Sequence, residues 1–72
     1  MKIGMLWFDN NPKIGVEDKV RRAAKYYQNK YGKAANLCFT ANWSGNVDGI
    51  DVRMSTSMPE YNFWIGQKEQ QP

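Results

Sequence analysis

The sequence predicts a single small α+β domain, in which one amphipathic helix packs on one face of a three- or four-stranded mixed sheet. Residues 16–31 carry apolar side chains with a helical period. A short apolar run precedes them, and the segments from residue 36 on alternate with a period of two. Clusters of turn residues separate these segments and give the order β-α-β-β-β. With 72 residues, the chain has room for one domain, residues 1–72, and one modest core.

The first predicted strand covers residues 2–8, an apolar run that ends at the turn sequence Asp-Asn-Asn-Pro of residues 9–12. One side of this strand carries Ile3, Met5 and Trp7, and the other carries Leu6 and Phe8. Apolar side chains on both faces are typical of a strand that is covered from both directions. We therefore expect this strand to avoid a bare sheet edge and to lie beside either the second or the last strand.

The helix is predicted for residues 16–31, between Gly15 as the N-cap and Gly32 as the residue that ends it. Its apolar stripe is about 100° wide, and Val20 and Tyr27 lie near the middle of that stripe. The charged residue Lys25 points the opposite way. One face of the helix is therefore expected to be buried against the sheet.

Three further strands are predicted at residues 36–42, 49–57 and 61–67, with residues 43–49 as a loop and residues 68–72 as a frayed tail. We expect these strands to form an antiparallel meander. In the second of them, Ile50, Val52 and Met54 share one side. In the last strand Tyr61, Phe63 and Ile65 are expected to face the helix, and Trp64 is expected to face away from it.

Little in the sequence indicates an enzyme. The chain has no histidine, and its one cysteine, Cys38, is predicted to be a small buried hydrophobe inside a strand. Asp48 and Asp51 superficially resemble the acidic motif of a metal-dependent nuclease. However, Asp48 is a natural turn residue, and Asp51 is placed to pair with Arg53 on the same strand face. The sequence therefore predicts no catalytic residue, no metal ligand and no cofactor.

The favoured functional prediction is a small protein-interaction or oligomerisation module that is not an enzyme. A core of this size rarely contributes more than about 3–5 kcal/mol, and one cysteine allows no internal disulfide. One helix covers one sheet face only, so apolar groups are expected to be left on the other face. The predicted interface residues are Leu6, Phe8 and Trp64. The predicted partner is a second copy, most simply in a two-fold dimer through this sheet face or through a strand edge, or another protein.

The alternative prediction is a nucleic-acid-binding protein without sequence preference. Residues 1–36 carry eight basic and three acidic residues, a charge of +5, whereas residues 37–72 carry two basic and four acidic residues, a charge of −2. The candidate contacts with nucleic acid are Lys19, Arg22, Lys25, Tyr26, Lys30 and Lys33. No apolar run is long enough to cross a membrane, and the expected location is the cytoplasm.

Overall fold

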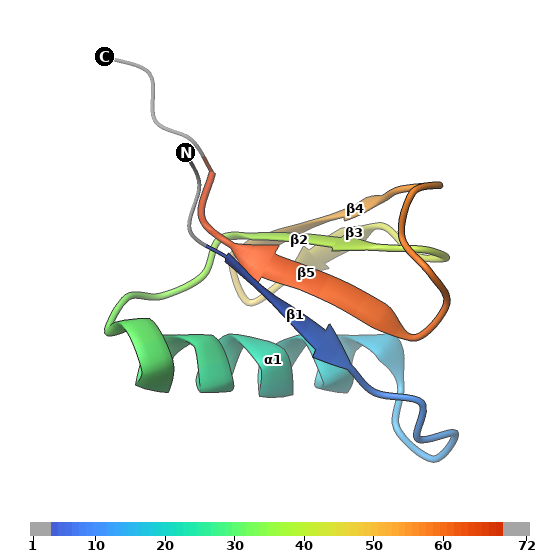
Figure 1. Cartoon of the computed structure of the whole chain (residues 1–72), viewed down its shortest axis with the longest axis horizontal. Helices are drawn as coiled ribbons and strands as arrows, with labels where there is room; N and C mark the ends of the chain where they lie inside the picture. The colour runs from blue at the N-terminus through green and yellow to red at the C-terminus, as the bar shows by residue number, and fades with distance from the viewer. Residues whose placement is uncertain (1–3, 69–72) are drawn as a thin grey trace.

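The chain forms one helix and a five-stranded sheet in a computed structural model that describes residues 4–68. The helix, α1 (Val16–Tyr31), spans the predicted residues and lies along one side of the sheet (Figure 1). These elements confirm the predicted α+β class, with one strand more than the sequence indicated. The strands are β1 (Gly4–Phe8), β2 (Leu37–Thr40), β3 (Gly45–Val47), β4 (Ile50–Met54) and β5 (Asn62–Gly66).

The additional strand, β3, lies within residues 43–49, where the sequence predicted a loop. Asp48 and Gly49 both have positive φ angles, 52° and 86°, as a type I′ hairpin turn requires. The Asn46 side chain also accepts a hydrogen bond of 3.1 Å from the Gly49 amide. An Asp-Gly pair is a strong hairpin signal, and it requires a strand on both sides of the turn.

The strand order is β1-β5-β2-β4-β3, so the predicted antiparallel meander is wrong. β3 pairs antiparallel with β4, and β2 pairs parallel with β4. The missed strand explains the error, because a tight hairpin after β3 reverses the direction of β4 relative to that expected for a direct β2–β4 hairpin. β5 then pairs antiparallel with both β1 and β2 and lies between them.

β1 lies beside the last strand, which is one of the two positions that the sequence left open. The expectation that this strand avoids a sheet edge is wrong for the described chain, because β5 is its one partner strand among residues 4–68. Apolar side chains on both faces of a strand do not determine how its two edges are paired, and on one of these faces Leu6 and Phe8 are exposed. Ile3, which was expected on the helix side, lies outside the described residues.

The core lies between α1 and the sheet, mainly over β5. Alternation along the strands sends one set of side chains toward the helix. This buried set includes Cys38, Val52, Phe63 and Ile65, which meet Val20, Ala23 and Tyr27 of the helix. Two residues expected on the same side are exposed, because Met54 ends its strand and Tyr61 precedes β5 in a turn with a φ of 66°.

The helix ends follow the sequence signals. Gly15 is the N-cap with an extended backbone, and Gly32 adopts the left-handed conformation with a φ of 74°. The Gly32 amide donates a hydrogen bond of 2.8 Å to the Gln28 carbonyl, which satisfies one of the last carbonyl groups.

At the C-terminal end of the described chain, the Lys68 amide donates a hydrogen bond to the Asn36 side chain. Residues 69–72 of the predicted tail lie outside the described residues.

We predict that Val20→Asp unfolds the domain, because Val20 is fully buried and a carboxylate there has no partner. Lys25→Asp is the matched control, because Lys25 is an exposed residue of the same helix, and we expect its melting temperature to stay close to that of the unmodified chain. Thermal unfolding followed by circular dichroism measures both. Equal losses in the two variants would contradict the observed orientation of the helix.

Candidate interaction surface

The face of the sheet opposite α1 carries no second layer formed by residues 4–68, and we call it the open face (Figure 1). The strand registers align side chains on this face in rows that cross the strands. The central row contains Leu6, Trp64, Phe39 and Arg53. Leu6 is 69% exposed, and Phe8, two residues further along β1, is 60% exposed. The open face is thus apolar from β1 to β2.

Trp64 connects the apolar side chains of the open face. Its indole ring lies over Gly4, where a Cβ atom would overlap the ring. The ring centroids of Trp64 and Phe39 are 5.8 Å apart, at an interplanar angle of 49°. Phe39, Ser55, Met58 and Trp64 line a shallow hollow of about 330 Å³. The structure therefore places the three predicted interface residues on one face and adds Phe39, Met58 and Gly4 to it.

The alternation of side chains along β2 indicates in the sequence itself that Phe39 lies on the open face. Phe39 alternates with Cys38 and Thr40, and both of these residues are buried on the helix side of β2. Placing the cysteine in the core therefore sends Phe39 to the open face. No comparable signal exists for Met58, because this residue comes from the connection between β4 and β5.

A small ion cluster borders the apolar row at its β4 end. Arg53 Nε lies 3.0 Å from Asp51 Oδ2, which confirms the predicted pairing of these residues. Lys68 Nζ lies 3.5 Å from the same carboxylate oxygen. The hydrogen bond from Arg53, with a further contribution from Lys68, lowers the pKa of Asp51. Leu37, which lies opposite Asp51 in the register, is 2% exposed.

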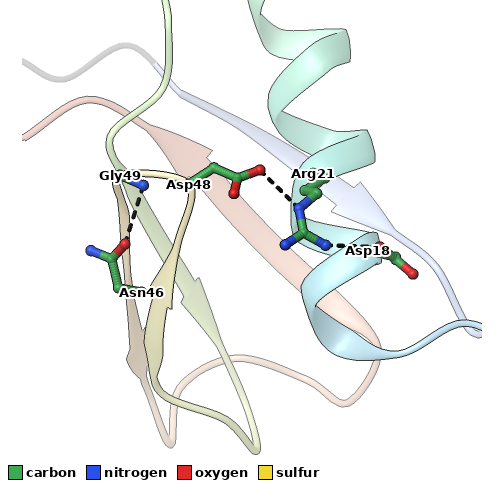
Figure 2. A network of polar contacts seen from close by, with 5 residues as sticks. All are labelled: Asp18, Arg21, Asn46, Asp48 and Gly49. Atoms are coloured by element: carbon green, nitrogen blue, oxygen red, sulfur yellow. Dashed lines mark hydrogen bonds and ion pairs between the residues drawn. The ribbon is translucent and has the colours of Figure 1, made fainter.

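Asp48 lies on the other side of the sheet, where Arg21 joins the helix to the β3–β4 turn. Arg21 Nε is 2.8 Å from Asp48 Oδ2, and Arg21 Nη1 is 2.9 Å from Asp18 Oδ1 (Figure 2). These hydrogen bonds, the one to Asp48 first, raise the pKa of Arg21. Asp48 and Asp51 therefore bind different cationic side chains on opposite faces and do not converge on one site. Within residues 4–68, no three His, Cys, Asp or Glu side chains gather in a way that could hold a metal ion.

The basic residues of α1 are divided between two sides of the helix. Lys25 lines a groove of about 250 Å³ together with Arg21 and Asp48, on the side of the β3–β4 turn. Tyr26 faces the β1 side, where its ring centroid lies 5.3 Å from that of Trp7. Beside Tyr26, a shallow hollow of about 410 Å³ includes Lys30.

One of the other candidate residues, Lys19, contributes differently from what the helical pattern indicated. Lys19 is only 7% exposed, and its ammonium group lies 5.5 Å from the ring centroid of Tyr61. Lys33 follows the helix and is exposed, as is Arg22 within it. The exposed cations and aromatic ring on the β1 side of the helix are therefore Arg22, Tyr26 and Lys30, a smaller set than the predicted one.

Comparison with known proteins gives no match: no family model, no curated protein and no solved structure is significantly similar to this chain. In the part of the chain that the structure describes, α1 is too short and too polar to cross a membrane, and no other helix is present there.

We predict that Cys38 does not react with thiol reagents in the folded protein. Cys38 is fully buried, as the sequence predicted, and burial raises the pKa of its thiol from 9.0 to about 12. Because the folded-state pKa is raised, the stability that comes from burying the neutral thiol is fully present below pH 9. It is lost as the pH rises toward about 12.

The measurement is labelling at pH 8, with and without urea, and with Ser44→Cys as an exposed positive control. Rapid labelling of Cys38 in the native chain would contradict its burial.

Proposed function

We propose that the protein is a protein-interaction module, not an enzyme. We propose that it binds a second copy of itself through the apolar residues exposed on its open face. The observation that carries this proposal is the exposure of Leu6 and Phe8 beside Trp64 and Phe39. Burying one such side chain contributes roughly 1.5–3 kcal/mol. For a domain of this size, that gain is comparable with a large share of the total stability.

Charge favours a second copy at this surface. The chain has a net charge of +3, so a contact surface with little charge adds no local repulsion between two copies. β1 contains no charged residue, and the nearest described cations on the open face, Arg53 and Lys68, are already paired with Asp51. An uncharged apolar surface of this kind is typical of contacts between identical subunits.

The residues that could perform catalysis are placed unfavourably for it. The cysteine is buried with a raised thiol pKa, and the two candidate aspartates face opposite sides of the sheet. The chain contains no histidine for general acid–base chemistry.

A lone buried thiol also suits a reducing compartment, which supports the cytoplasm as the proposed location.

Sedimentation equilibrium between about 5 and 500 μM, a range in which weak to moderate dimers dissociate, tests the proposal. We expect the unmodified chain to show a dimer and the double variant Leu6→Ser, Phe8→Ser to be monomeric over the same range. Met54→Ser is the matched control, because Met54 is 61% exposed and, by alternation with the buried Val52, lies on the side of the sheet opposite to the open face. We expect this control to dimerise normally. A strictly monomeric unmodified chain would reject self-association.

As a second candidate function, we propose weak binding of nucleic acid through Arg22, Tyr26 and Lys30. The supporting observation is the hollow beside the 54% exposed Tyr26 ring, which offers a stacking surface next to a cation. With the two cations of this set neutralising about two phosphates, log affinity should fall with log salt at a slope of about −1.4 to −1.8. Fluorescence anisotropy with single- and double-stranded oligonucleotides measures this slope.

Lys30→Glu should weaken binding of either oligonucleotide, whereas Lys68→Glu, a charge change of the same size elsewhere, should have little effect. No binding at tens of micromolar in low salt would contradict this function.

A further inference from the structure

The outer edge of β1 presents backbone groups that no other described strand pairs with. The Asp9 amide donates a hydrogen bond of 3.0 Å to the Tyr61 carbonyl, which continues the register between β1 and β5. In an antiparallel pair, consecutive residues alternate between pointing toward the partner strand and pointing away from it. Asp9 points toward β5, so the amides and carbonyls of Gly4, Leu6 and Phe8 point outward.

This edge lacks the features that normally prevent strands from joining. β1 contains no charged residue and no proline, and its register with β5 is continuous. The other edge of the sheet differs, because β3 has three residues and ends at a turn with positive φ angles. β1 is thus the edge that can accept an additional strand over its whole length.

We propose that a second copy of this chain pairs antiparallel with β1 through its own β1, so that one continuous sheet runs through both copies. This inference rests on the proposed function and specifies its geometry. A two-fold axis at Leu6 places Leu6 opposite Leu6 of the second copy and Gly4 opposite Phe8. In this register every outward-pointing amide and carbonyl of β1 has a partner, whereas a shifted register leaves some of them unpaired.

The side chains fit the same register. On the open face, Phe8 of one copy lies across from Gly4 of the other, where no side chain competes for the space. The indole of Trp64 already lies over Gly4, so the arriving Phe8 ring meets an aromatic surface. The two Leu6 side chains meet at the axis. The most exposed apolar residues of the open face therefore gain cross-strand neighbours from the same pairing that satisfies the backbone.

Cross-linking through Leu6→Cys tests the register. Directly opposite residues in a hydrogen-bonded antiparallel pair have Cα atoms about 5.5 Å apart, within the range of a disulfide. We expect mild oxidation to give a covalent dimer whose disulfide is cleaved by a reducing agent.

The matched control is Phe8→Cys, on the same edge and face, where the two introduced thiols would be more than about 13 Å apart. Its cross-linked fraction should be at least several-fold lower. The unmodified chain should not cross-link, because Cys38 is buried. Equal yields at the two positions, or no cross-link at position 6 in a chain that dimerises, would overturn the register.

Leu6→Pro provides a second test. Proline removes the outward-pointing amide at this position and leaves the hydrogen-bonding groups that face β5 in place. Leu6→Val, which keeps the amide, is the control. We expect the dimer dissociation constant of Leu6→Pro to be at least about tenfold higher than that of Leu6→Val, because a symmetric pair of hydrogen bonds is lost. Sedimentation measures the dissociation constants, and circular dichroism checks that both variants fold.

The outcomes separate this inference from the proposed function. An unmodified chain that stays monomeric up to about 500 μM contradicts both. A dimer that Leu6→Pro leaves as tight as Leu6→Val, but that the Leu6→Ser, Phe8→Ser change abolishes, supports self-association and rejects pairing through β1.

Discussion

The structure depends on the packing of one helix against one face of the sheet. Val20, Ala23 and Tyr27 meet Phe63 and Ile65 of β5, and this contact is the centre of the core. A single helix packs on one face of the five-stranded sheet, so the sheet has one buried face and one open face. The apolar groups left on the open face are therefore a consequence of the single helix that residues 4–68 supply.

The sequence predicted the elements of this fold better than their arrangement. The helical period of residues 16–31 and the two flanking glycines placed both helix ends correctly, because these signals are local. One apolar run that ends at a turn and three alternating segments predicted four of the five strands for the same reason. The neighbour of each strand is a non-local property that a period of two does not contain. Missing β3 then reversed the expected direction of β4, so one local error became an error of topology.

The candidate surface shows the same division between local and non-local information. Parity along β1 and β5 was enough to send Leu6, Phe8 and Trp64 away from the helix. The contribution of Phe39 and the role of Gly4 beneath Trp64 depend on β5 lying between β1 and β2, which the sequence did not indicate. The basic residues of the helix were selected by their angle around its axis. That angle alone does not show that Tyr61 covers Lys19 or that Lys25 faces the β3–β4 turn.

The shortness of β3 has a consequence for how far an assembly of this protein could grow. A sheet with two open, unguarded edges can add copies at both ends without limit, which leads to fibres. Here the turn at Asp48 and Gly49 closes β3 after three residues, and Arg21 anchors that turn to the helix. A copy joined at β1 would therefore present only this blunt edge on its far side. Growth would stop at a closed pair, and the same sequence would be protected from fibril formation.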